Sequence, residues 1–97
     1  MPTYITLYRY TPKGVGNIKD GPARLDAARK AMEAAGGKIL GFYLTMGRYD
    51  LVVISELPDD KTEAKLALTL ASQGNVSSET LRAFTEDEYR EIIQSLP

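Results

Sequence analysis

The pattern of apolar and polar residues divides the first third of the chain into a strand, a loop and a helix. Residues 2–11 (PTYITLYRYT) are rich in β-branched and aromatic residues and end before Pro12, which has no N–H to donate, so they predict a strand. Residues 13–21 contain three glycines and no usable period, so they predict a loop. Residues 22–35 predict a helix that two glycines end. Its apolar face consists of Leu25, Ala28, Met32 and Ala35, while Arg24, Lys30 and Glu33 point elsewhere.

Two strand-like runs follow, residues 38–46 (KILGFYLTM) and 49–57 (YDLVVISEL). Only Gly47 and Arg48 separate them, and a two-residue loop with glycine at its first position is typical of a type II′ turn. The two runs therefore predict a tight hairpin.

A second helix is predicted to begin at residues 58–60 (PDD), with Asp60 as the N-cap and Glu63 completing a pair like a capping box. Gly74 ends this helix. Its expected buried stripe is Ala64, Ala67, Leu68 and Ala71, widened by Leu70.

The last quarter of the chain predicts an edge strand and a short helix. Residues 75–84 (NVSSETLRAF) lack the apolar weight of a central strand. Thr85 and Glu88 have the spacing of a capping box, which predicts a helix over residues 86–95 with acidic residues in its first turn.

The order strand, helix, strand, strand, helix, strand, helix predicts an α+β fold. It is the βαββαβ arrangement of ferredoxin-like domains plus a C-terminal helix, with an antiparallel sheet of strand order 4-1-3-2 and both main helices on one face. A chain of 97 residues suits one domain, so we expect residues 1–97 to form a single unit.

Strands one to three are apolar on both faces, although a half-exposed strand should alternate. Residues 51–54 (LVVI) show this without a break. Because two helices cover only one face of the sheet, a second copy packed face to face is the simplest cover for the other. The sequence therefore predicts a homodimer or a larger assembly of this chain. The alternative is a monomer with a tolerable apolar patch.

Composition excludes several kinds of chemistry. The chain has no Cys and no His, which removes thiolate nucleophiles, Ser-His pairs and most zinc or iron sites, so we predict no metal and no cofactor. A net charge of −1 without a basic stripe argues against nucleic acid as a partner. No apolar run approaches a membrane span and no signal segment follows Met1, so we expect a cytoplasmic protein that does not bind membranes.

One edge of the predicted sheet gathers polar side chains, because it collects the end of the first strand, the hairpin tip and the start of the fourth strand. We predict a ligand-binding site there. Its candidate residues are Arg9, Lys13, Asn17, Tyr43, Tyr49 and Asp50. A purely structural interpretation remains open, with Gly47 serving the turn and Asp50 pairing with Arg9.

Several segments resemble the GYD-domain family of small bacterial proteins across essentially the whole chain. They include residues 11–14 (TPKG), 21–24 (GPAR), 45–50 (TMGRYD) and 74–76 (GNV). The signature Gly, Tyr and Asp would be Gly47, Tyr49 and Asp50. The resemblance implies a ferredoxin-like fold of the dimeric α/β-barrel type, whose superfamily includes ligand-sensing domains, cofactor-free monooxygenases and small isomerases.

Two functions are compatible with these residues. The first is a non-catalytic module for a small, partly apolar molecule, in which Tyr43, Tyr49 and Asp50 orient the ligand while Arg9 or Lys13 meets an anionic group. The alternative is a cofactor-free oxygenase or isomerase-like enzyme using Asp and Tyr as acid and base. Without His such an enzyme needs a strongly perturbed side chain, which favours the binding module. A subunit that only builds an assembly is a third interpretation.

Overall fold

The computed structural model describes residues 1–97. Its elements are β1 (Thr3–Tyr10), α1 (Pro12–Gly16), the 3₁₀ turn η1 (Ile18–Asp20), α2 (Gly21–Ala34), β2 (Lys38–Leu44), β3 (Leu51–Glu56), α3 (Asp60–Ser72), β4 (Val76–Ala83) and α4 (Glu86–Gln94). The two main helices, the four strands and the C-terminal helix all begin and end within a few residues of the predicted positions.

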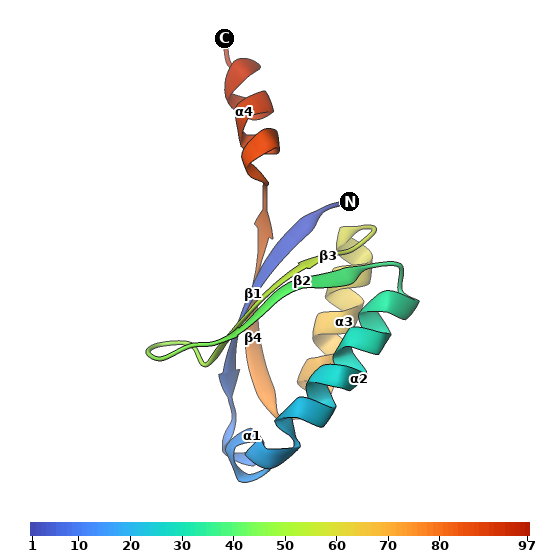
Figure 1. The fold of residues 1–97 in the computed structure, drawn as a ribbon, viewed down its shortest axis with the longest axis vertical. Coiled ribbons are helices and arrows are strands. Elements are labelled where there is room, and N and C mark those ends of the chain that lie inside the picture. Colours follow the sequence, from blue (N-terminus) through green and yellow to red (C-terminus); the bar gives the residue numbers. More distant parts are fainter.

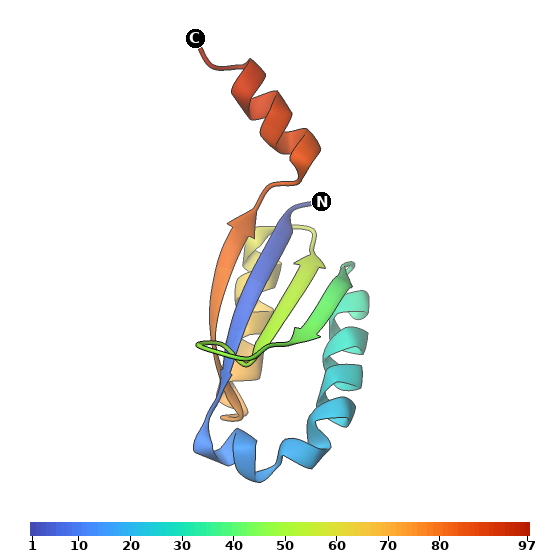
Figure 2. The same cartoon turned by 60° about the vertical axis from the view of Figure 1, so that its left-hand side comes forward.

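The four strands form one antiparallel sheet in the order β2-β3-β1-β4, which confirms the predicted order 4-1-3-2. Helices α2 and α3 lie on the same side of this sheet (Figures 1 and 2). The architecture is the predicted α+β, ferredoxin-like arrangement, and the other side of the sheet carries no helix.

Alternation along β1 decides what each side of the sheet contains. Tyr4, Thr6 and Tyr8 are buried and face the helices, whereas the intervening Ile5 and Leu7 are only half-buried and face away from them. The core under the helices is centred on Tyr4, Met32 and Leu57, with Ile39 and Leu66 packed against them.

The side without helices, called here the open face, is largely apolar. Its side chains share one side of the sheet because directly paired residues point the same way. They include Ile5, Leu7, Tyr43, Val52, Ile54 and Leu81.

The segment predicted as a loop after the first strand contains a short helix, so that prediction was wrong. Thr11 caps α1, because its Oγ1 accepts from the N–H of Gly14 at 3.1 Å, and Pro12 stands at the first helical position. A helix of five residues is too short to show an apolar period, and the glycines concealed the capping signal.

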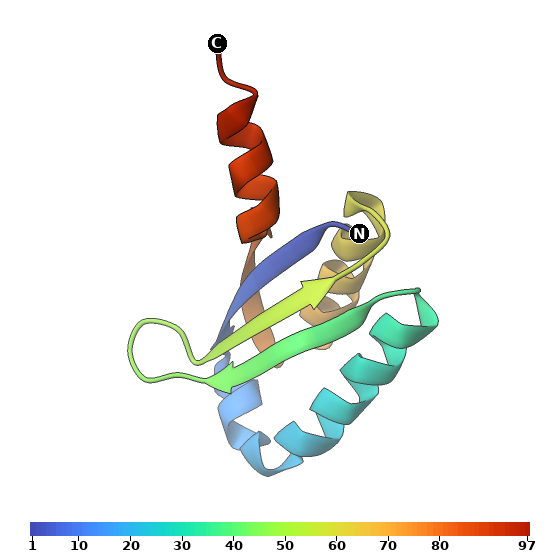
Figure 3. The ribbon, with the colours of Figure 1, turned by 45° about the horizontal axis from the view of Figure 1, so that its top comes forward.

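The hairpin between β2 and β3 is wider than predicted. The N–H of Thr45 donates to the carbonyl oxygen of Asp50 at 2.8 Å, which leaves residues 46–49 as a four-residue loop in place of a two-residue turn (Figure 3). Gly47 has φ +123°, the backbone region that glycine tolerates. The Oγ1 of Thr45 also donates to the carbonyl of Tyr49 at 2.6 Å, which holds the wider loop.

Helix α3 is capped and oriented differently from the prediction. Asp59, not Asp60, is the N-cap, because its extended backbone lets its carboxylate accept from the N–H of Thr62 at 2.8 Å. Asp60 instead accepts from the hydroxyl of Tyr4 at 2.5 Å, and Glu63 is buried. The buried face is therefore rotated from the predicted stripe, and Leu68 is 72% exposed. The residues that pack inward are Glu63, Leu66, Ala67 and Leu70.

The C-terminal helix begins with the predicted capping box, in which Thr85 and Glu88 exchange both hydrogen bonds. Helix α4 projects beyond the end of the sheet and away from α2 and α3 (Figures 1, 2 and 3). It exposes an apolar stripe made of Tyr89, Ile92 and Ile93, which Leu96 continues just beyond the end of the helix. Neither α4 nor any other helix has the length and apolar character needed to cross a membrane.

Candidate functional site: a cavity between helix α2 and the sheet

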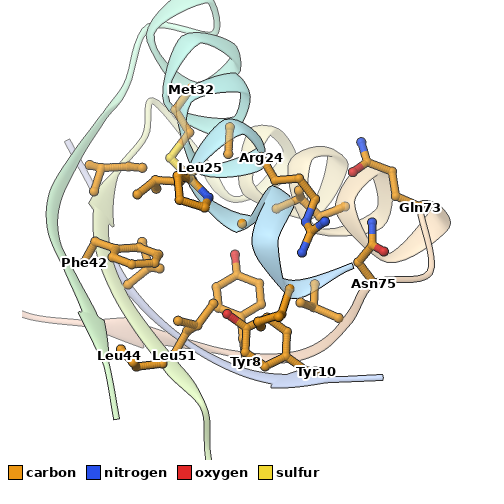
Figure 4. Close-up of a pocket in the computed structure, with 18 residues that line it drawn as sticks. Tyr8, Tyr10, Arg24, Leu25, Met32, Phe42, Leu44, Leu51, Gln73 and Asn75 are labelled. Carbon is orange, nitrogen blue, oxygen red and sulfur yellow. The ribbon is translucent and has the colours of Figure 1, made fainter. Parts of the chain in front are cut away.

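A cavity of about 300 Å³ lies between α2 and the covered face of the sheet. Of the 18 residues that line it, 13 are hydrophobic. Figure 4 shows Leu25 and Met32 of α2 facing Phe42, Leu44 and Leu51 of the hairpin across this space. Its volume is at the small end of the range for ligand sites, roughly 300–1,000 Å³.

Arg24, in the first turns of α2, is the only charged residue of the cavity lining. Its Nη1 donates to the main-chain oxygen of Asn17 at 3.1 Å, which fixes the guanidinium group. Its Nη2 is buried and has no hydrogen-bond partner. Because buried polar groups are nearly always hydrogen-bonded, an unpartnered guanidinium nitrogen at an apolar cavity requires an explanation.

Asn75 stands beside Arg24 at the same end of the cavity (Figure 4). Its side-chain oxygen Oδ1 is likewise buried without a partner. Its main chain is held firmly, since its carbonyl oxygen accepts from the N–H of Thr11 at 3.0 Å, and the Oγ1 of Thr11 donates to the carbonyl of Gly74 at 2.6 Å. A Cβ on Gly14 would lie 1.9 Å from the carbonyl oxygen of Asn75, so only glycine permits this approach.

Tyr8 and Tyr10 of β1 form another part of the cavity wall. Burial, with a smaller contribution from the Glu63 carboxylate, raises the pKa of Tyr8 to about 12. The phenol therefore stays neutral at physiological pH and keeps its proton as a hydrogen-bond donor.

The sequence interpretation missed Arg24, because the helical period placed this residue away from the apolar face. The structure corrects this: Arg24 lines the cavity near the N-terminus of α2, at the same end as Asn75, which directly precedes β4. Asn75 is adjacent to the glycine that ends α3. One signal in the sequence could have indicated an anion-binding role for Arg24. The first turn of α2 has no acidic residue, although acidic residues are favoured at that position.

The six predicted ligand residues do not form one cluster. Arg9, Tyr43 and Tyr49 lie on the open face, whereas Lys13 and Asn17 lie in the α1 segment behind the cavity wall. The Nζ of Lys13 donates to the carbonyl oxygen of Gln73 at 2.7 Å, and the Nδ2 of Asn17 donates to the carbonyl of Lys13 at 3.1 Å.

Tyr49 reaches from the hairpin loop across the open face. The guanidinium carbon of Arg9 lies 5.1 Å from the centroid of the Tyr49 ring, within cation–π range. The Tyr49 hydroxyl donates to Oε2 of Glu79 on β4 at 2.8 Å. The loop is thereby tied across β1 to the far edge of the sheet.

Asp50 binds the main chain of β1. Its Oδ2 accepts from the N–H of Tyr10 at 2.8 Å, and its own N–H donates to the carbonyl oxygen of Tyr8 at 2.8 Å. The pairing of Asp50 with Arg9 that the sequence suggested does not occur, because Asp50 continues the β3 backbone beside β1 and its carboxylate is engaged there.

These observations define the chemistry that the cavity offers. It combines an apolar wall with one cation, the carboxamides of Gln73 and Asn75 and two phenols, and no carboxylate lines it. No group of three or more carboxylates converges to hold a metal ion. The arrangement is suited to holding a small amphipathic molecule.

Comparison with known proteins gives the family. A family model described as the GYD domain matches residues 4–93. The chain belongs to the GYD-domain family. A protein of Thermus thermophilus named glutamine synthetase and cystathionine beta-lyase binding protein is 34% identical over 84 residues, which cover 86% of this chain and 88% of that protein.

The fold agrees with a solved structure as well. The crystal structure of TTHA0845 from Thermus thermophilus has a TM-score of 0.56 and 28% sequence identity, covering 88% of this chain and 95% of that one. In the GYD protein the signature residues have structural roles: Gly47 permits the loop, Tyr49 ties it to β4, and Asp50 joins β3 to β1.

Proposed function

We propose that this GYD protein is a non-catalytic binding module that holds a small, partly apolar molecule in the cavity between α2 and the sheet. The observation that carries the proposal is the polar end of a largely apolar cavity, where Arg24 and Asn75 line the space and each keeps a buried polar atom, Nη2 and Oδ1, without a partner. A bound molecule with a polar end and an apolar body would meet these two side chains and fill the space.

The distribution of titratable groups favours binding over acid–base catalysis. The cavity lining contains no Asp, Glu or Lys. Burial raises the pKa of Glu63, but this carboxyl group lies outside the lining and accepts from Thr80 at 3.4 Å. Asp50, the general base of the enzyme alternative, accepts a main-chain hydrogen bond.

We propose separate roles for the six predicted ligand residues. Lys13 and Asn17 support the cavity, since Lys13 binds the main chain at the end of α3 and the carbonyl of Asn17 orients Arg24. Arg9, Tyr43 and Tyr49 lie on the open face, where they would contact a neighbouring copy rather than the cavity ligand.

The assembly that we propose is a homodimer through the open face. Ile5, Leu7, Val52 and Ile54 are central on this face and only half-buried, and Tyr43 is 57% exposed. A second copy packed face to face would remove these side chains from water. Sedimentation velocity over a concentration series tests this, because a monomer at all concentrations would contradict it.

Binding to an enzyme is a second candidate function. One ground is the name of the 34% identical relative, which is called an enzyme-binding protein. The other is the exposed apolar stripe of α4, most of which lies within residues 4–93, the part of the chain that matches the GYD family model. Titration with purified glutamine synthetase tests it. We expect binding by the native protein and weaker binding by Ile93→Glu, because the new charge would be buried at the contact. Equal binding by both would contradict a role for α4.

The cavity itself is tested with a variant that fills it. Ala28 lines the cavity, whereas Ala23 is exposed on the same helix and does not. Ligand-observed NMR with a panel of small aromatic and aliphatic acids, amides and alcohols should detect binding to the native protein and to Ala23→Trp. Ala28→Trp should abolish that binding, because the indole occupies the ligand volume. Unchanged binding by Ala28→Trp, or none by the native protein, would contradict the proposal.

A further inference from the structure

The charge of the cavity limits the ligand that fits it. Arg24 supplies one positive charge, and no carboxylate lies within ion-pair distance of it: the ion pairs of the protein are Lys38 with Glu56 and Arg90 with Glu86. A guanidinium group that is partly removed from water loses favourable hydration energy, and an ion pair with a bound anion would compensate for that loss. The cavity therefore favours a ligand with a single negative charge.

The start of α2 adds to this field. Gly21 and Pro22, the first two residues of the helix, line the cavity next to Arg24. The helix N-terminus carries partial positive charge, yet its first turn has no acidic residue and the side chain of Asp20 makes no capping bond. Two positive features thus face the same end of the cavity: the guanidinium group of Arg24, which has no ion-pair partner, and a helix N-terminus that no side chain caps by a hydrogen bond.

Asn75 supplies a second contact for an anion. Its carboxamide stands next to the guanidinium of Arg24 (Figure 4). The oxygen and nitrogen of a carboxamide are assigned from their hydrogen-bond partners, and Oδ1 has none here. Rotation of the amide presents its NH₂ group to an anion held by Arg24, so that one planar anion would receive donors from both side chains.

The rest of the cavity wall determines which uncharged part of a ligand fits. Apart from Gln73 and the hydroxyls of Tyr8 and Tyr10 it is apolar, and a volume of about 300 Å³ corresponds to roughly ten water-sized groups at about 30 Å³ each. The charge of a phosphate exceeds the single positive charge of Arg24. A carboxylate carries one negative charge, and its two oxygens match the planar edge of the guanidinium group. Resting on the proposed function, we infer that the cavity binds a small monocarboxylate, with its carboxylate between Arg24 and Asn75 and an aliphatic or aromatic body against Phe42 and Leu44.

Matched acids and amides test this inference on the full chain. Phenylacetate and hexanoate are compared with phenylacetamide and hexanamide by isothermal titration calorimetry. We expect each acid to bind at least about tenfold more tightly than its amide, the ratio typical of a charged hydrogen bond. Arg24→Gln should remove this preference. Arg29→Gln, which changes an arginine of the same helix outside the cavity lining, should keep it.

A second variant guards against misfolding of Arg24→Gln, which circular dichroism would reveal. Asn75→Asp is nearly isosteric and places a carboxylate beside Arg24, so it should also remove the preference for the acid. Equal affinity of acid and amide for the native protein would overturn the inference and leave the proposed cavity binding intact. Failure of all four probes to bind would overturn the inference, and failure of the wider panel as well would overturn the proposed function.

Discussion

The two sides of the sheet differ in the groups that lack a partner: polar atoms on the covered side and apolar side chains on the open side. On the covered side, the core residues are packed under helices, while four side chains keep a buried polar atom without a partner: Arg24 and Asn75 at the cavity, and Ser55 and Glu63 outside its lining. On the open side, the polar groups of Tyr49 and Glu79 are paired with each other while Ile54 and its apolar neighbours lack cover.

This difference indicates two kinds of partner. Polar side chains that line a small apolar cavity bind a small molecule with complementary polar groups. Uncovered apolar area on a flat sheet is completed by another flat surface, such as a second copy of the chain.

The largest expected effect is on the open side. Ile54 lies on an interior strand, paired with Ile5 and Gly41. Ile54→Glu would bury a charge from each copy in the apolar contact, and we expect the dimer dissociation constant to rise about a hundredfold or more, as measured by sedimentation. Leu68→Glu on the exposed side of α3 is the control and should not change assembly. A dimer that Ile54→Glu leaves intact would contradict packing through this face.

On the covered side, Gly14→Ala should damage the support of the cavity. The new Cβ would meet the carbonyl oxygen of Asn75, and we expect the free energy of unfolding in urea to fall by about 2–3 kcal/mol, with loss of probe binding. Gly16→Ala in the same short helix meets nothing within 4 Å and should stay within about 0.5 kcal/mol of the native protein. Equal stability of the two variants would show that α1 does not hold Asn75 in place.

A smaller effect concerns pH. Burial raises the pKa of Glu63, so the folded state holds this proton more tightly than the unfolded state, whose pKa is about 4.5. The contribution of Glu63 to stability is present below that pH and is lost as pH rises through the folded pKa.

Glu63→Gln should therefore reduce the fall in stability above about pH 5 and should be more stable than the native protein at pH 7. Urea denaturation across this range measures both effects, with Glu33→Gln on the exposed surface of α2 as the control. Asp59 and Glu88 have lowered pKa values, so they affect stability at more acidic pH. Parallel pH profiles of Glu63→Gln and the native protein would contradict the account.

Local signals in the sequence predicted much of the fold. The capping box of Thr85 and Glu88 involves residues three apart, and the predicted hydrogen bonds are present. The strand order followed from the alternation of strands and helices. The start of α3 was not predictable in this way, because Asp59 and Asp60 are equivalent caps in sequence and only the Tyr4 hydroxyl distinguishes them.

The cavity could not be predicted, because it depends on distances between segments. Arg24 and Asn75 are 51 positions apart, and only the folded chain brings them to the same end of the cavity. Tyr49 shows the same limit, since its position in a predicted turn gave no sign that its hydroxyl would reach Glu79 across another strand. Burial and hydrogen bonding in three dimensions supply what the sequence pattern lacks.

Native mass spectrometry of the gently purified protein, followed by a denaturing spectrum of the same sample, tests the cavity claim most directly. We predict a dimer of the 10.7 kDa chain that carries one small additional mass per chain and loses it on denaturation. A species without additional mass that also gains none when titrated with the panel of small apolar acids, amides and alcohols would contradict the claim that the cavity is a binding site.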